Sequence, residues 1–210
     1  MSLPGPTVFV LDDDPAVLRG LTRLLQTSGF EVRAFASPRA FLEQHDPAIP
    51  GCLVLDVAMP ALNGLDVQKA LAAEGDRAII FIAGQADVAT GVRAMKAGAV
   101  DFLTKPFDES QLLGAVTAAI EKDRAVRAVR EGLRAVQQRL ATLTSREREV
   151  FERVVAGRLN KQIAADLGTT EKTVKVHRAR VMQKMGATSL AQLVRSAGSI
   201  GTEPGRPSGR

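Results

Sequence analysis

Short apolar runs alternate with amphipathic stretches through the first half of the chain. The clearest run is Cys52 to Leu55, four apolar residues that follow Gly51 and end at Asp56. A continuous apolar run bounded by turn residues is typical of a strand buried on both faces, as in a parallel sheet, and we expect the central strand at Gly51–Asp56. Comparable runs predict four more strands, at Thr7–Leu11, Glu31–Phe35, Ala78–Ala83 and Val100–Thr104.

Helical patterns separate these strands. Asp14 followed by Pro15 is typical of a helix start, with an N-cap and then proline at the first turn. Five strands alternating with helices predict an α/β fold with a doubly wound parallel sheet. Right-handed crossovers would bring the carboxyl ends of the strands to one edge. The other helices in this part are expected at Pro38–Gln44, Gly64–Ala73 and Asp87–Ala97.

A long helical segment follows, because no proline occurs between Glu109 and Leu140. We expect one long helix or two in succession. Its apolar residues recur at intervals of three and four, the pattern of a coiled-coil seam, which predicts dimerisation. A helix packed on its own domain is the alternative, because the repeat is short and Gly132 interrupts it. The seam residues are Val126, Val129, Leu133, Val136 and Leu140.

The last part of the chain predicts a bundle of short helices. Thr144 and Glu147 have the spacing of a capping box at a helix start. Asn160–Leu167 and Glu171–Met185 are helical patterns separated by a turn that contains Gly168, which is the order of a helix-turn-helix. Residues 198–210 are rich in Gly, Pro and Ser and are expected to be a disordered tail.

Composition limits the class of protein. The 210 residues are enough for one or two domains, and one cysteine and two histidines argue against disulfide frameworks and Cys- or His-based zinc sites. The first residues have no signal-peptide pattern, and no apolar run reaches the length of about 20 residues that a bilayer requires. We therefore expect a cytoplasmic protein with no membrane partner.

Charge divides the chain into two parts. Residues 1–122 contain 10 Lys and Arg against 15 Asp and Glu, a net charge of −5, whereas residues 123–210 contain 18 against 8, a net charge of +10. This asymmetry predicts two domains with different partners, the second of which would bind nucleic acid.

Acidic residues follow two of the predicted strands. Asp12 and Asp13 come after the first strand, Asp56 ends the central strand, and Lys105 follows the last one. Carboxylates gathered at one edge of the sheet suit Mg²⁺, and the lysine could contact a phosphoryl oxygen. Asp56 could then be the nucleophile that forms an acyl phosphate. The alternative is that these are unrelated loop residues, because aspartate is common in turns.

Residues 7–120 resemble a response-regulator receiver domain, which has a flavodoxin-like fold. The resemblance rests on Asp12-Asp13, on Asp56 in Leu-Asp-Val-Ala-Met-Pro, and on Lys105-Pro106. It implies that Asp56 is phosphorylated by a sensor histidine kinase and that Lys105 contacts the phosphoryl group. Mg²⁺ would be bound by Asp13, Asp56 and the backbone carbonyl of Ala58, and by Asp12 through water.

One position departs from that family. Ala83 stands at the end of the fourth strand, where receivers usually have Thr or Ser whose hydroxyl binds the phosphoryl group. A hydrogen bond to a charged acceptor is worth about 1.5–3 kcal/mol, so its loss weakens the expected switch in residues 83–107. Phe102 matches the aromatic switch position of the family, and ordinary strand core is its alternative role.

Residues 142–197 resemble the LuxR-type DNA-binding domain, a four-helix module. The matching segments are Leu143–Val150, Asn160–Ala164 and Thr173–His177. The resemblance implies base contacts by the exposed face of Glu171–Met185, while its flanking cations would bind phosphates. The expected DNA-binding residues are Lys172, Thr173, Lys175, Val176, Arg178, Ala179, Arg180 and Lys184.

Together the two resemblances indicate a two-component response regulator of the FixJ/NarL class. We expect a receiver at 1–121, a helical linker at 122–141, a DNA-binding domain at 142–197 and the tail at 198–210. Its partners would be a histidine kinase, double-stranded DNA and a second copy of the chain. Two rivals remain: a receiver that serves only as a docking or dimerisation module, and a Mg²⁺-dependent phosphohydrolase. The phosphohydrolase is disfavoured because Ala58 stands where such enzymes often have a second Asp.

Overall fold

A computed structural model describes residues 5–60, 62–74, 77–84 and 88–201, except the side chains of residues 73 and 74. The chain divides into two compact units, Met1–Arg127 and Ala128–Arg210, which are described separately below.

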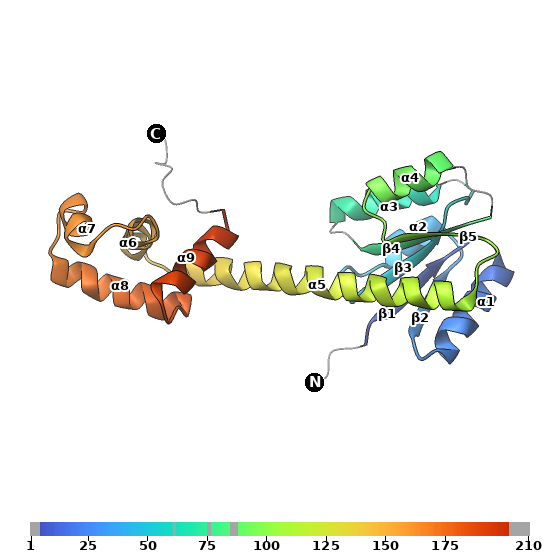
Figure 1. The fold of residues 1–210 in the computed structure, drawn as a ribbon, viewed down its shortest axis with the longest axis horizontal. Coiled ribbons are helices and arrows are strands. Elements are labelled where there is room, and N and C mark those ends of the chain that lie inside the picture. The colour runs from blue at the N-terminus through green and yellow to red at the C-terminus, as the bar shows by residue number, and fades with distance from the viewer. Residues whose placement is uncertain (1–4, 61, 75–76, 85–87, 202–210) are drawn as a thin grey trace. The chain divides into compact units, whose positions relative to one another are not determined.

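The first unit is built on a parallel sheet with the strand order β2-β1-β3-β4-β5 (Figure 1). Strand and helix alternate along the chain, as the sequence predicts. The elements are β1 (Thr7–Leu11), α1 (Pro15–Thr27), β2 (Glu31–Phe35), α2 (Pro38–Gln44), β3 (Gly51–Asp56), α3 (Gly64–Glu74), β4 (Ala78–Ala83), α4 (Val88–Lys96) and β5 (Asp101–Thr104). Strand β5 begins one residue later than expected, and Asp87, the expected start of α4, lies outside the described residues.

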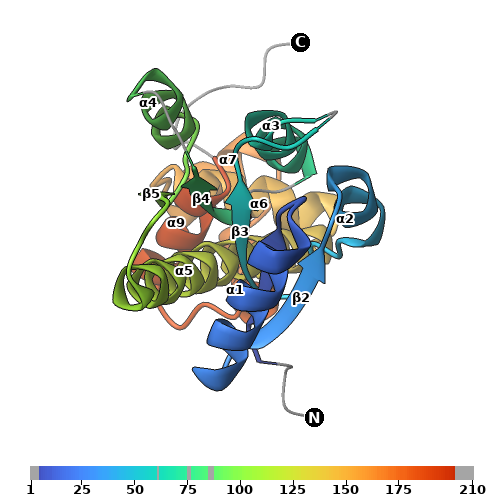
Figure 2. The same cartoon turned by 90° about the vertical axis from the view of Figure 1, so that its right-hand side faces the viewer.

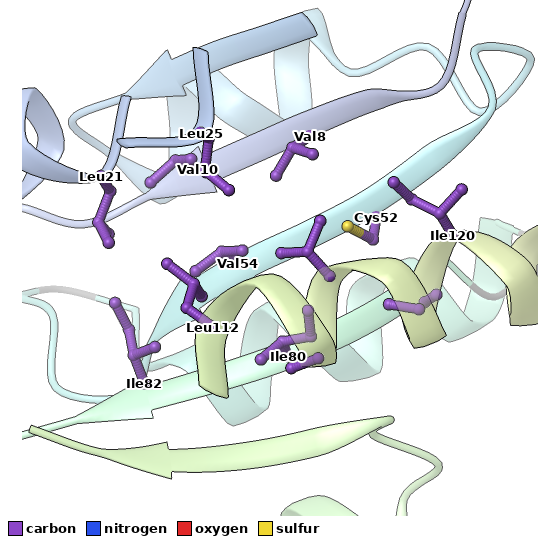
Figure 3. Packing of buried hydrophobic residues seen from close by; sticks show 14 residues of the cluster. Val8, Val10, Leu21, Leu25, Cys52, Val54, Ile80, Ile82, Leu112 and Ile120 are labelled. Carbon is purple, nitrogen blue, oxygen red and sulfur yellow. The ribbon is translucent and has the colours of Figure 1, made fainter. Parts of the chain in front are cut away.

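Helices cover both faces of the sheet, which explains the unbroken apolar runs. Helices α1 and α5 (Glu109–Ala141) pack on one face, and α2, α3 and α4 cover the other (Figure 2). Alternate residues of β3 therefore enter different cores: Cys52 and Val54 face α1 and α5, whereas Leu53 and Leu55 face the other helices. Figure 3 shows Val54 among buried side chains from α1, α5 and the neighbouring strands.

Helix α5 is continuous over 33 residues, so Gly132 does not break it. Its first turns supply Leu112, Val116 and Ile120 to the core of the first unit. The predicted dimer seam is only partly available, because Val136 and Leu140 pack on the core of the second unit. This is the alternative that the sequence left open, and it leaves Val129, which is 64% exposed, as the most accessible seam residue.

The second unit consists of the end of α5 and four short helices. These are α6 (Ser145–Val155), α7 (Asn160–Asp166), α8 (Glu171–Met185) and α9 (Leu190–Ser199). Helix α9 extends two residues into the segment expected to be disordered, because Ala197 is buried in the core and anchors the last turn. Residues 202–210 of that expected tail lie outside the described residues.

The backbone of the first unit requires glycine at position 51. Its φ is +138°, and a Cβ at this position would lie 1.9 Å from the carbonyl oxygen of Thr7 in the neighbouring strand. Neither the conformation nor the space suits an L-residue, because positive φ strains a side chain and strand backbone cannot move aside.

Gly51→Ala is expected to lower the free energy of unfolding of this unit by at least about 2 kcal/mol, through strain and displacement of β1. Amide hydrogen exchange of β1 and β3 measures it. Gly20→Ala is the matched control, because Gly20 lies in α1 with nothing within 4 Å of an added Cβ. That change should stabilise α1 slightly, and equal stability of the two variants would contradict the argument.

Candidate functional site

Parallel pairing brings the predicted acidic residues to one place. Strands β1 and β3 are neighbours, with Leu11 paired to Leu55, so Asp12 and Asp56 follow at adjacent positions of the same edge. Strand order reverses between these two strands, which is where open α/β sheets bind ligands. Lys105 follows β5, and its backbone N–H donates to the carbonyl oxygen of Ala83 at the end of β4, 2.7 Å away.

Lys105 joins the two carboxylates. Its Nζ donates to Asp12 Oδ2 at 2.9 Å and to Asp56 Oδ1 at 2.8 Å. Burial by itself lowers the pKa of Lys105, but hydrogen bonds and attraction to Asp56 and Asp12 outweigh it, so the pKa is raised and the side chain stays protonated. Asp12 and Asp56 are only 1% and 5% exposed, so water compensates little of their negative charge. The ammonium group of Lys105, which both carboxylates share, is their main compensation.

Backbone groups fix both carboxylates further. Asp56 Oδ2 accepts from the N–H of Ala58 at 2.7 Å, and Asp12 Oδ1 accepts from the N–H of Asp14 at 2.9 Å. Asp13 is exposed at the same edge. The donor set fits a hard divalent cation, because two buried carboxylates share one ammonium, Asp13 adds a third carboxylate after the same strand, and oxygen ligands with water suffice for Mg²⁺. Within the described ranges no three His, Cys, Asp or Glu side chains already form a metal-ligand cluster.

The two predicted switch residues lie at β4 and β5, where Ala83 binds the backbone of Lys105 and Phe102 lies near Phe81 and α4. Ala83 is buried at the end of β4 and has a methyl group where receivers usually have a hydroxyl. Phe102 is partly buried, with its ring 6.2 Å from that of Phe81 and in contact range of Gly91 in α4. Its packing on α4 is compatible with both a switch and a core role.

The second unit contains the predicted helix-turn-helix in α7 and α8. Gly168 adopts φ +60° in the turn, and Thr170 caps α8 by accepting from the N–H of Thr173 at 3.2 Å. Val174, Val181 and Met185 fix α8 on the core. The opposite face is exposed and carries five of the predicted DNA-binding residues, namely Lys172, Lys175, Val176, Ala179 and Arg180.

The remaining three predicted DNA-binding residues have partners inside the unit. Thr173 Oγ1 lies 2.9 Å from Thr170 Oγ1 in the cap, and Arg178 Nη1 donates to Asn160 Oδ1 at 3.1 Å, which joins α8 to α7. Lys184 Nζ donates to Glu147 Oε2 at 2.6 Å and to the carbonyl oxygen of Thr142 at 3.0 Å. Lys184 is therefore committed to an internal ion pair.

Glu147 is the important residue that the sequence reasoning missed. The capping-box pattern found its role at the start of α6, where it accepts from the N–H of Thr144 at 2.9 Å. No local pattern indicates its ion pair with Lys184, 37 residues away. That pair fastens the start of α6 to the end of α8. Arg139 adds a second connection, because its Nη1 donates to the carbonyl oxygen of Met185 at 3.4 Å.

Comparison with known proteins agrees with this arrangement. Residues 8–117 match the family model "response regulator receiver domain", and residues 141–197 match "bacterial regulatory proteins, luxR family". The chain belongs to the response regulators that join a receiver to a LuxR-type DNA-binding domain, and it is a transcription regulator.

The chain is similar to several regulators along most of their length. The chain is 47% identical to nodulation protein W of Bradyrhizobium diazoefficiens, covering 92% of this chain and 86% of that protein. It is 45% identical to the transcriptional regulatory protein FixJ of Azorhizobium caulinodans, covering 97% and 95%. The solved structure of the response regulator StyR is 45% identical and covers 92% of this chain and 98% of that one, with a TM-score of 0.83.

No helix in the described part of the chain is long and apolar enough to cross a bilayer.

Acid should weaken the second unit through Glu147. Its hydrogen bonds to Lys184 and Thr144 lower the pKa of Glu147 from 4.5 to about 2. A depressed carboxyl pKa contributes stability that is complete above pH 4.5 and is lost as pH falls towards 2. Wild type should therefore exceed Glu147→Gln in free energy of unfolding at neutral pH, and the difference should shrink over that interval.

Urea unfolding followed through amide signals of α6 and α8 measures this difference. Glu152→Gln changes an exposed acid of α6 and serves as the control, which should show a much smaller difference. A difference between wild type and Glu147→Gln that does not vary with pH would contradict the assignment.

Proposed function

We propose that Asp56 accepts a phosphoryl group from a sensor histidine kinase, and that phosphorylation promotes dimerisation and promoter binding by the basic second unit. The observation that carries this proposal is the bridge from Lys105 to Asp12 and Asp56 at the switch point of the sheet. The match of residues 8–117 to the receiver-domain family supports the same assignment.

The residues of the pocket divide the chemistry among them. A carboxylate oxygen of Asp56 forms the bond to phosphorus as the bond from phosphorus to the histidine nitrogen of the kinase breaks. Lys105 lies 2.8 Å from Asp56 Oδ1 and can compensate negative charge on the transferred group. The N–H of Ala58 already donates to the other oxygen of Asp56 and orients the nucleophile.

Mg²⁺ is the cofactor that this donor set supports. Asp13, Asp56 and the backbone carbonyl of Ala58 would bind it directly, and Asp12 through water. When bound, the ion supplies positive charge next to the phosphoryl oxygens. One ammonium cannot compensate three carboxylates and an incoming phosphate together, which is the physical reason for a second cation.

The exposed face of α8 is the proposed DNA-reading surface. Lys175, Val176 and Ala179 would lie in the major groove, where the apolar pair can contact only groups such as a thymine methyl. Lys172 and Arg180 would bind phosphates and position the helix. Thr173, Arg178 and Lys184 would support that helix from within, because each already has a partner in the unit.

Asp56→Asn tests phosphorylation. With acetyl phosphate and Mg²⁺, wild type should take up one phosphoryl group and bind a duplex selected by the full chain at least about tenfold more tightly, whereas the asparagine cannot form the acyl phosphate. Mass spectrometry and fluorescence anisotropy at fixed salt measure the two effects. Asp66→Asn, an acid at the start of α3, is the control. Phosphate on another residue, or equal affinities, would reject the proposal.

A regulator whose receiver acts only as a docking module is the second candidate, and Ala83 favours it. Ala83→Thr should increase the phosphorylation-dependent gain in DNA affinity by about tenfold, because the hydroxyl can donate to the phosphoryl group. Valine has nearly the same shape as threonine but no hydroxyl, so Ala83→Val should not increase the phosphorylation-dependent gain in DNA affinity. If neither wild type nor Ala83→Thr gains affinity on phosphorylation, the docking module is the better description.

A further inference from the structure

A cavity of about 390 Å³ lies in the first unit among α3, α4, α5 and the start of β4. Ala78 and Ile79, the first residues of β4, form part of its wall, so it is at the opposite edge of the sheet from Asp56. Its volume is within the range of small-molecule sites. Neither the phosphoacceptor chemistry nor the DNA-binding surface uses it.

The described residues that line the cavity carry a net positive charge. Arg77, Lys96 and Lys122 line it, and Asp123 is the one acid among the described residues that do so. Asp123 is already compensated, because its Oδ2 accepts from the N–H of Gly51 at 2.9 Å and from Arg127 Nε at 2.7 Å. Among the described residues of the wall, the three cations therefore exceed the negative charge beside them.

Arg77 is the buried cation of this group, with 7% of its surface exposed. Its Nη2 donates to the carbonyl oxygens of Asp46 and Ile49, at 3.0 and 3.2 Å, and its Cζ lies 4.4 Å from the ring centre of Phe9. Within the described residues its Nε and Nη1 have no hydrogen-bond partner. Burial above all lowers the pKa of Arg77 to about 10, as expected for a buried cation with incomplete compensation.

The carbonyl oxygens at the end of α4 have hydrogen-bond donors, which reduces their repulsion of an anion. Carbonyl oxygens at a helix C-terminus carry partial negative charge. Here Gln68 Nε2 donates to the carbonyl oxygens of Ala94 and Ala97, at 3.2 and 3.1 Å, and Lys122 Nζ donates to that of Gly98 at 3.2 Å. Lys96 and Lys122 are themselves exposed and can reach a ligand in the cavity.

We propose that this cavity binds a small dianion, with phosphate or carboxylate groups, between Lys96 and Lys122 and above the fixed charge of Arg77. The two ammonium groups would contact the ligand, and Arg77 would attract it without a direct hydrogen bond. Binding at this site does not depend on phosphorylation of Asp56, since the residues concerned lie at the other edge of the sheet.

Amide NMR of the unphosphorylated, ¹⁵N-labelled full chain tests the proposal. Inorganic phosphate and succinate are titrated separately, with sodium chloride adjusted to hold ionic strength constant. Saturable shifts are expected at Gly98 and Lys122, and the tighter of the two ligands identifies the preferred group. The double variant Lys96→Gln/Lys122→Gln should weaken binding at least about tenfold, through loss of two charged contacts.

The control is Lys69→Gln/Arg93→Gln, which removes the same charge from α3 and α4 at positions outside the cavity wall. It should retain most of the affinity. The proposal would be overturned if the shifts rose linearly without saturation for both ligands. It would also be overturned if both double variants reduced the shifts equally, because either result would show only general attraction of anions. Shifts confined to the second unit would do the same.

Discussion

The shared ammonium of Lys105 is the interaction on which the first unit depends. Two buried carboxylates at neighbouring strand ends would repel each other strongly, and Lys105 lies within 3 Å of both. The sheet order makes this possible, because it places β1 beside β3 and leaves the end of β5 close to that of β4. The same arrangement leaves two buried carboxylates with one ammonium at this edge, so the carboxylates carry more charge than Lys105 compensates.

Much of this pocket could be predicted from the sequence, because strand patterns and crossover rules are local or general. The unbroken apolar run before Asp56 and the turn residues around it predicted β3 to the residue. Strand ends meet at one edge in any parallel sheet, so Asp12, Asp56 and Lys105 could be brought together without coordinates. The division of roles between Asp12 and Asp13, one buried in the bridge and one exposed, depends on side-chain packing that adjacent letters do not indicate.

The second unit shows where sequence reasoning ends. Helical spacing found α8, but it did not show which of its cations have partners within the unit. The structure separates them, since Lys184 pairs with Glu147 and Arg178 with Asn160, whereas Lys175 remains exposed. Such pairs join residues that are 18 or 37 positions apart in the sequence. They depend on how the helices pack, which the spacing of residues within one helix does not indicate. The heptad pattern in α5 does not show either that Val136 and Leu140 pack against the core of their own unit.

The last turns of α5 have a consequence for how such modules recombine in evolution. The family match to the second unit starts at residue 141, yet Val136 and Leu140 pack on its core and Arg139 binds the end of α8. A gene fusion that joined a new partner at the family boundary would inherit an incomplete module, with part of its core open to water. Exchange of output domains would therefore preserve the fold best when the crossover falls upstream, inside the helix.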